Sequence, residues 1–83
     1  MLFITAGGIQ LIEVRLFATF RDGRDKVVLL SPNEFKSAGD IIDYLKIPRQ
    51  EVAILLINGR YSAVDTPVND GDVLALFPPV GGG

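Results

Sequence analysis

The sequence predicts an α+β fold, with one main helix packed across one face of a mixed sheet of about four to five strands. Three observations carry this prediction. Apolar and polar residues alternate early in the chain, a short capped helix pattern lies in the middle, and a β-branched run ending in Asn-Gly follows it. A chain of 83 residues has room for one hydrophobic core, so these elements are expected to share it.

The first predicted strand begins near Gln10 and is identified by its period of two. One face is apolar and the other is mostly polar, which is typical of a half-buried strand. Phe17 breaks the pattern by placing an aromatic ring on the polar face. The residues of the apolar face are Ile12, Val14, Leu16, Ala18 and Phe20.

A turn and a second strand come next. Arg21–Asp25 contains Asp-Gly between two strand patterns, which is a hairpin signal. Lys26–Leu30 (KVVLL) is mostly apolar and returns as the second strand. Pro32 ends that strand, because proline cannot donate a ladder hydrogen bond.

The helix pattern begins after Ser37, which is placed as an N-cap with Asp40 three residues later, in the spacing of a capping box. Pro48 prevents the helix from continuing. A helix of roughly nine or ten residues is unstable in isolation, so it needs a sheet to pack against. The predicted packing face consists of Ala38, Ile41, Ile42 and Leu45.

The second half of the chain predicts three more extended segments. Val52–Ile57 is a continuous apolar run, which indicates a strand covered on both sides, and Asn58-Gly59 is a strong hairpin turn. Arg60–Val68 is a weaker, edge-like stretch, Asn69–Asp72 forms a second tight turn, and Val73–Phe77 is the last strand. This order fits a β-grasp arrangement, in which the first and last strands lie side by side in the middle of the sheet.

These elements divide the chain into a single domain over residues 9–77, an N-terminal arm over residues 1–8 and a flexible functional tail over residues 78–83. The arm is read as a loose extension, an extra edge strand or an upstream start, with Gly7-Gly8 as its hinge. It lacks the basic region of a secretory signal, and no run approaches the roughly 20 apolar residues of a membrane span. A cytoplasmic protein is expected.

Composition narrows the chemistry. The net charge is -2 with no basic cluster, which argues against nucleic acid or an acidic membrane as a partner. Cysteine and histidine are absent, which removes thiol nucleophiles, histidine bases and the usual zinc or iron–sulfur ligands, and no calcium-binding loop motif appears. No metal site is predicted. The mean hydropathy of +0.35 is high for a short chain, and fits either a partner interface or a well-filled core.

The sequence ends with Leu-Phe-Pro-Pro-Val-Gly-Gly-Gly, residues 76–83. Pro78-Pro79 favours a stiff, extended exit from the last strand. Val80–Gly83 then projects by at most roughly 13–14 Å, and glycines without side chains fit a narrow channel. At the end lies an α-carboxylate, whose usual pKa of about 3.3–3.7 makes it ionised at neutral pH.

A carboxylate becomes a reactive acyl group when a partner enzyme adenylates it. A sulfur donor that displaces AMP then leaves a thiocarboxylate, whereas a lysine, usually after a thioester, gives an amide. Glycine-rich ends are also typical of frayed tails and linkers. The rigid Pro-Pro exit from a predicted central strand favours the functional interpretation.

Three segments resemble a known family: Val14–Arg24 (VRLFATFRDGR), Ile54–Arg60 (ILLINGR) and, most specifically, Asp70–Gly83 (DGDVLALFPPVGGG). From about Ile12 to Gly83 the chain resembles the small sulfur carriers of the MoaD/ThiS type, which are ubiquitin-like β-grasp proteins. The resemblance implies that Gly83 is adenylated by an ATP-dependent E1-like enzyme and thiocarboxylated with sulfur from a separate donor. It implies no bound cofactor and no catalysis by the chain itself.

The Phe-Pro-Pro-Val form is similar to the MoaD branch, which implies the small subunit of molybdopterin synthase. In that role the tail enters the large subunit and gives sulfur to a pterin precursor of the molybdenum or tungsten cofactor. Gly83 is then the reacting residue, and Phe77 is either core or an apolar anchor. The expected partner-binding residues are Gly82, Gly81, Val80, Pro79, Pro78 and Phe77.

Other functions share this tail. A carrier for thiamine synthesis or tRNA thiolation uses the same activation, and so does a ubiquitin-like modifier joined to lysines. A β-grasp binding module with an inert tail is the remaining alternative. Gly81 departs from the family, where a hydroxyl residue is common at this position. Phe17 and Arg60 are possible partner contacts.

The acidic residues have structural readings. Asp70 and Asp72 are expected to form turns. Asp40 and Asp43 are expected to cap the start of the helix and to place negative charge beside the positive end of its dipole, rather than to form a catalytic carboxylate pair.

Overall fold

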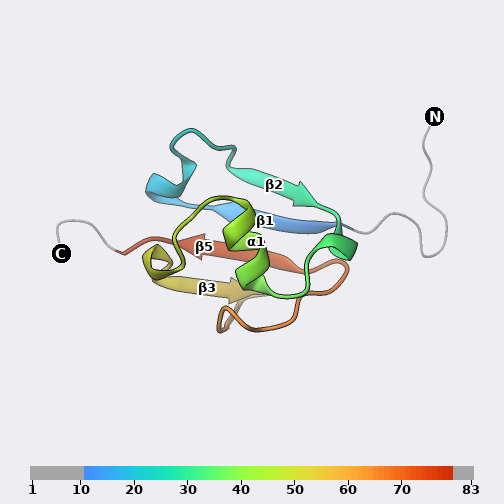
Figure 1. The fold of residues 1–83 in the computed structure, drawn as a ribbon. Coiled ribbons are helices and arrows are strands. Elements are labelled where there is room, and N and C mark those ends of the chain that lie inside the picture. The colour runs from blue at the N-terminus through green and yellow to red at the C-terminus, as the bar shows by residue number, and fades with distance from the viewer. Residues whose placement is uncertain (1–10, 80–83) are drawn as a thin grey trace, which may run out of the picture.

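The computed structural model of the chain describes residues 11–79, in which five strands form one sheet with one α-helix across it (Figure 1). The strands are β1 (Ile12–Leu16), β2 (Val27–Leu30), β3 (Ile54–Ile57), β4 (Arg60–Tyr61) and β5 (Val73–Phe77). The helix is α1 (Ala38–Tyr44), and three short 3-10 turns are η1 (Ala18–Arg21), η2 (Pro32–Glu34) and η3 (Arg49–Glu51).

The two central strands come from opposite parts of the chain. The strand order is β2-β1-β5-β3-β4, and β1 pairs with β5 in parallel, from Glu13 opposite Val73 to Leu16 opposite Leu76. All other strand pairs are antiparallel. The sheet is therefore mixed, and the predicted α+β, β-grasp arrangement with the first and last strands side by side is confirmed.

The first strand is shorter than predicted. It ends at Leu16, because Ala18 adopts a left-handed backbone conformation (φ 53°) and the chain turns into η1. The predicted face is therefore wrong at Ala18, which is exposed. Phe20 still reaches the core, with 4% of its surface exposed, because the tight turn brings its side chain back over the sheet.

The helix start is confirmed in detail. The Asp40 main-chain nitrogen donates to Ser37 Oγ (3.4 Å), and the Ser37 nitrogen donates to Asp40 Oδ2 (3.3 Å), which completes a capping box. The first turn is also held from outside, since the nitrogens of Ala38 and Gly39 donate to the carbonyls of Thr66 (3.0 Å) and Val64 (2.7 Å).

The helix ends earlier than Pro48 requires. It has seven residues rather than nine or ten, because Lys46 takes a left-handed conformation (φ 61°). The Lys46 nitrogen donates to the Asp43 carbonyl (3.0 Å) and the Ile47 nitrogen to the Ile42 carbonyl (3.2 Å). This pair of bonds is a Schellman motif, which closes the helix before the proline can act.

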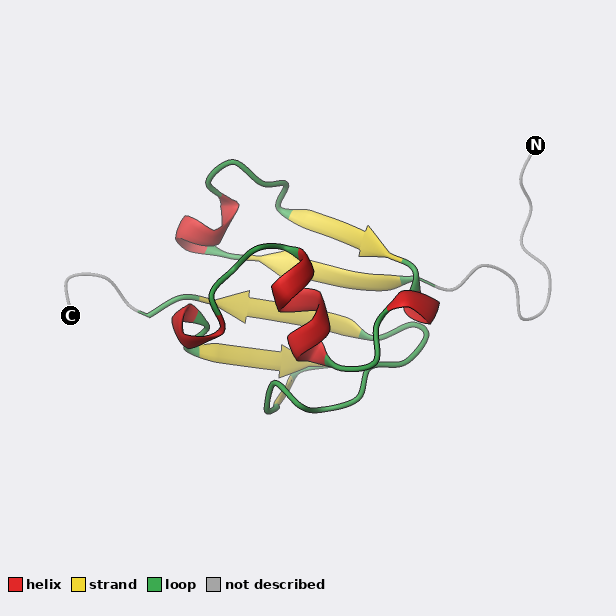
Figure 2. Cartoon of the chain, in the orientation of Figure 1, coloured by secondary structure: helices red, strands yellow, loops and turns green. Residues whose placement is uncertain are grey.

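The prediction that the third strand is covered on both sides is wrong. Leu55 and Ile57 are buried, whereas Ile54 and Leu56 are half-buried. One helix covers one face of the sheet (Figure 2), and the described chain places no second layer on the other. A continuous apolar run can therefore come from a strand with one open apolar face.

The later turns form as predicted, but the edge strand is short. Asn58 (φ 54°) and Gly59 (φ 81°) both lie in the left-handed region, as a two-residue hairpin turn requires. Of the extended stretch Arg60–Val68, Arg60 and Tyr61 form β4 and pair with β3, and the Ser62 nitrogen donates to the Leu55 carbonyl (2.9 Å). The turn at Asn69–Asp72 has Gly71 at φ 84°.

The core lies between the sheet and the helix. Within the described residues, no helix is long and apolar enough to cross a membrane. The buried apolar residues are Ile12, Val14, Leu16, Phe20, Leu30, Phe35, Ala38, Ile41, Ile42, Ile47, Leu55, Ile57, Val68, Leu74 and Leu76.

Candidate functional site: the tail base and the open sheet face

The predicted tail begins at the end of a central strand. β5 ends at Phe77, and the chain after it leads away from the sheet (Figure 1). Pro78 is half-buried and Pro79 is exposed. Because proline fixes its own φ and restricts the residue before it, Phe77 to Pro79 has few available conformations. The other predicted tail residues, Val80, Gly81, Gly82 and Gly83, lie outside the described residues.

Phe77 is not part of the buried core. Its ring is half-buried and stacks on Phe17, with centroids 4.3 Å apart and planes 9° apart. The Phe77 carbonyl accepts from the Ala53 nitrogen (2.9 Å), and the Phe17 nitrogen donates to the Leu76 carbonyl (3.2 Å). The main chain at Phe77, which with Pro78 we call the tail base, is therefore held by hydrogen bonds from the segments on both sides of β5. The aromatic ring of Phe77 remains accessible.

Arg21 joins this aromatic pair. Its guanidinium carbon lies 5.3 Å from the centroid of the Phe17 ring, and its Nε donates to the Leu16 carbonyl at 2.7 Å. The attraction between a cation and a ring face favours this position. The sequence interpretation missed Arg21, because the contact depends on η1 returning the chain toward Phe17.

The uncovered face of the sheet is largely apolar and continuous with the tail base. Strand pairing places Val27 beside Arg15, Leu29 beside Glu13 and Tyr61 beside Leu56 on this face. Tyr61 is 81% exposed, Leu29 57% and Val27 45%. We call this surface the open sheet face; its apolar residues are Val27, Leu29, Ile54, Leu56, Tyr61, Val73, Ala75, Phe17 and Phe77.

The open sheet face also carries charge near its middle. Glu13 and Arg15, both on β1, form an ion pair with each other. Exposed apolar surface of this extent on a small protein is typical of an interaction site. Of the two explanations for the high mean hydropathy, the structure supports a partner interface in addition to a filled core.

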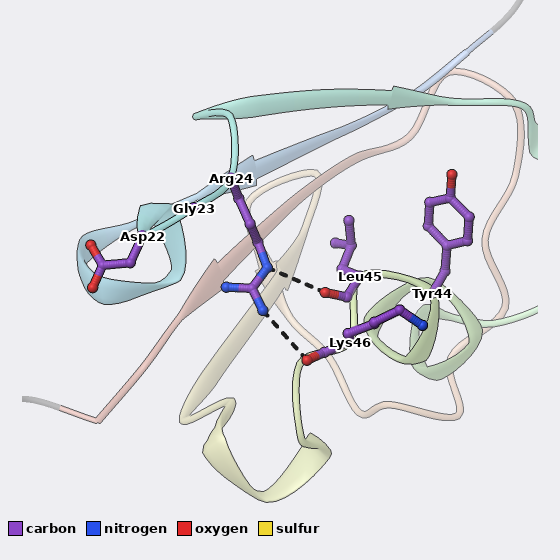
Figure 3. A pocket seen from close by; sticks show the side chains of 6 residues that line it. All are labelled: Asp22, Gly23, Arg24, Tyr44, Leu45 and Lys46. Atoms are coloured by element: carbon purple, nitrogen blue, oxygen red, sulfur yellow. Dashed lines mark hydrogen bonds between the residues drawn. The ribbon is translucent and has the colours of Figure 1, made fainter.

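A groove lies on the side of the sheet that the helix covers. This open groove of about 660 Å³ is lined by Asp22, Gly23, Arg24, Tyr44, Leu45 and Lys46 (Figure 3). Arg24 fills its centre by donating from Nε to the Leu45 carbonyl (3.2 Å), from Nη2 to the Lys46 carbonyl (3.4 Å) and from Nη1 to the Phe20 carbonyl (3.3 Å). A cation at the end of a helix is favourable there, so Arg24 has a structural role. Of the predicted site residues that the structure describes, Phe77, Pro78 and Pro79, none lines the groove.

Asp40 has the structural role that the sequence favoured, whereas Asp43 does not, because it lies in the last turn of α1 and pairs with Arg49. Asp40 belongs to the capping box, and Asp43 accepts two hydrogen bonds from Arg49 (3.0 and 2.9 Å). That hydrogen bonding holds the pKa of the Asp43 carboxyl below its usual value and raises the pKa of Arg49. Among residues 11–79, no group of three or more acidic side chains is placed to hold a metal ion.

The two turn aspartates differ. Asp72 accepts from the Asn69 nitrogen (2.8 Å) and from Asn58 Nδ2 (2.9 Å), so it fixes its own turn and braces a second one. Asp70 lies exposed in the same turn. Arg60, a possible partner contact, is exposed on the edge strand.

Comparison with known proteins identifies the family and the fold of this chain. A model of the ThiS family matches residues 14–83. SAMP1 from Haloferax volcanii, a small archaeal modifier protein, is 28% identical with a TM-score of 0.70, over 88% of this chain and 99% of that one. A putative molybdopterin converting factor subunit 1 from Pyrococcus furiosus is also 28% identical, with a TM-score of 0.65 over 86% and 99% of the two chains.

One further structure shares the fold. It is a protein–protein complex of subunits 1 and 2 of the molybdopterin-converting factor from Helicobacter pylori. The similar chain in it is 24% identical, with a TM-score of 0.59 over 88% of this chain and 99% of that one. No curated protein sequence matches the chain significantly.

Proposed function

The chain belongs to the ThiS family of ubiquitin-like sulfur carriers, and on that premise we propose that Gly83 is its reacting residue, adenylated and then converted to a thiocarboxylate. The observation that carries the proposal is the family match extending to Gly83, over a tail that starts at the rigid Pro78-Pro79 exit of a central strand. Gly82, Gly81 and Val80 are proposed to pass through the partner's channel.

The proposed chemistry takes place in two steps. The Gly83 carboxylate attacks the α-phosphorus of ATP, forming an acyl-adenylate and releasing pyrophosphate. A hydrosulfide ion, released by a sulfide donor, then attacks the acyl carbon, the bond from that carbon to the AMP oxygen breaks, and the sulfur loses its proton and remains as the thiocarboxylate. The partner enzyme supplies the catalytic groups, and this chain supplies the acyl group and its placement.

The open sheet face is proposed as the surface on which the activating and acceptor enzymes dock. It lies beside the point where the tail leaves the sheet, since the Phe17–Phe77 stack belongs to both. Docking there presents the tail base to a partner in a fixed orientation, which lowers the ordering cost of binding.

We propose molybdopterin synthesis as the pathway, with this chain as the small subunit of the synthase and a large subunit as its partner. The 28% identity to the Pyrococcus furiosus putative molybdopterin converting factor subunit 1 supports this assignment. The Phe77–Val80 sequence, Phe-Pro-Pro-Val, supports the same branch. Carriers for thiamine synthesis or tRNA thiolation are the alternatives within the family.

A ubiquitin-like modifier is the second candidate function. It is favoured by the equal identity, 28%, to the small archaeal modifier protein of Haloferax volcanii. In that case the activated Gly83 carbonyl forms an amide with a lysine of a target protein. Activation is the same, so the two functions separate only after adenylation.

Intact-mass measurement tests the proposal. The chain is incubated with its cognate activating enzyme, ATP and a sulfur donor, beside a Gly83 deletion, a Gly82→Val variant and an Asp70→Ala control. The wild type and the control should gain the mass difference between sulfur and oxygen, and the two tail variants should not. Thiocarboxylate formation in the Gly83 deletion would sink the proposal, conjugates that resist reductants would favour the modifier, and an unchanged wild-type mass would favour an inert tail.

A further inference from the structure

The hairpin turn at Asn58-Gly59 has a sequence whose chemical reactivity does not involve the tail. Asn58 is followed by glycine, whereas Asn33 is followed by Glu34 and Asn69 by Asp70. An asparagine side chain can be attacked by the main-chain nitrogen of the next residue, and glycine, with no side chain, hinders that attack least. The turn is exposed, and nothing lies within 4 Å of the position that a Gly59 side chain would occupy.

The Asn58 side chain is nevertheless held away from that reaction. Its Nδ2 donates to Asp72 Oδ1 (2.9 Å), and its Oδ1 accepts from the Val73 nitrogen (2.9 Å). The Asn58 main-chain nitrogen also donates to the Val73 carbonyl (2.8 Å). The Asn58 carboxamide is therefore oriented toward the neighbouring turn. Its hydrogen bonds to Asp72 and Val73 must break before the Gly59 nitrogen can reach its carbon.

We propose that Asn58 is a self-modification site whose rate of deamidation is controlled by Asp72. A bond forms between the Gly59 nitrogen and Asn58 Cγ, the Cγ–Nδ2 bond breaks, and the amide leaves as ammonia with the proton from the Gly59 nitrogen. Water then opens the cyclic imide at either carbonyl, which gives aspartate or isoaspartate at position 58. No oxidant, metal or enzyme is required.

The product weakens the brace that restrained the reaction. A carboxylate at position 58 no longer donates to Asp72, and it places a second negative charge beside that carboxylate. Isoaspartate also lengthens the main chain within a two-residue turn, whose length fixes the pairing register of β3 and β4. The modification is therefore one-way and loosens the β3–β4 edge of the sheet.

Peptide mass mapping after incubation in mildly alkaline buffer tests the control by Asp72. The full chain is compared with Asp72→Ala and with Asp70→Ala, which makes the same change in the same turn. Loss of the bond to Asp72 should accelerate deamidation of Asn58 about tenfold, the factor that corresponds to about 1.4 kcal/mol. Asp70→Ala should match the wild type, and Asn33 should remain unchanged in all three. Equal rates in the two aspartate variants would overturn the proposal.

Two further comparisons separate local control from general loosening of the fold. Ile47→Ala destabilises the core near the end of the helix, where Ile47 is 3% exposed. If this variant deamidates as fast as Asp72→Ala at equal stability in urea, control by Asp72 is wrong. The free peptide Leu56–Ser62 should deamidate faster than the wild-type protein, and equal rates would also contradict the proposal, even if Asp72→Ala fails to fold.

Discussion

Replacing Arg24 by alanine should lower the free energy of unfolding by about 2 kcal/mol, because one side chain ties the loop after η1 to the end of α1. Its shortest bond, from Nε to the Leu45 carbonyl, is 3.2 Å. A hydrogen bond to a charged group contributes about 1.5–3 kcal/mol, and a cation at a helix end about 0.3–1 kcal/mol. The other two bonds, at 3.3 and 3.4 Å, are longer and add less, and water in the open groove can rehydrate the released carbonyls.

Urea unfolding followed by circular dichroism measures this change. In a domain of this size, about 2 kcal/mol corresponds to a fall in melting temperature of roughly 8–16 °C, with the urea m-value unchanged. Arg60→Ala is the matched control, because Arg60 is an exposed arginine on the edge strand and its loss should cost less than about 0.5 kcal/mol. If Arg24→Ala is as stable as Arg60→Ala, then the bonds in the groove contribute nothing and the reasoning is refuted.

Three other predictions follow from the local geometry. Lys46→Gly should raise the urea midpoint modestly, because relief of the left-handed conformation (about 1–2 kcal/mol) exceeds the added freedom of the unfolded chain (about 0.4–1 kcal/mol); a lower midpoint would contradict this. The pKa of Asp43 is lowered in the folded state by Arg49, so the stability advantage of wild type over Asp43→Asn should be full above the unfolded pKa and vanish as pH falls through the lowered one; an advantage that persists in strong acid would count against it. Phe77→Ala should raise the KM of the activating enzyme for the carrier in ATP–pyrophosphate exchange, while kcat changes little. An unchanged KM would show that the Phe17–Phe77 stack is not part of the docking surface.

Local features were predictable from the sequence wherever a few neighbouring residues decide the structure. The capping box of Ser37 and Asp40 and the turn at Asn58-Gly59 depend on side chains within the motif, so both appeared where expected. The end of β1 was not predictable, because Ala18 adopts a conformation that its side chain does not favour. The prediction of where α1 ends was wrong for the same reason, because Lys46 also adopts a left-handed conformation.

Pairings between distant segments needed the structure or the fold resemblance. The apolar run Val52–Ile57 has the same appearance whether one or two faces are covered, and only the position of the single helix decides the matter. The functional tail was predicted from its composition and stays a prediction, whereas the surface beside it was not predicted from the sequence. Phe17 and Phe77 lie far apart in the sequence and meet because β1 and β5 run in parallel.

Because β1 and β5 are parallel, the chain enters β1 at one end of the sheet and leaves β5 at the other end. β1 begins at Ile12 beside the turn at Asp72, while β5 ends at Phe77 beside Phe17, at the opposite end (Figure 1). A fluorophore or affinity handle joined ahead of Leu11 would therefore enter the molecule at the end remote from Pro78. Under the proposed function, such a handle would hold immobilised protein by the end away from Pro78, whereas the same handle attached after Gly83 would block the carboxylate that is proposed to react.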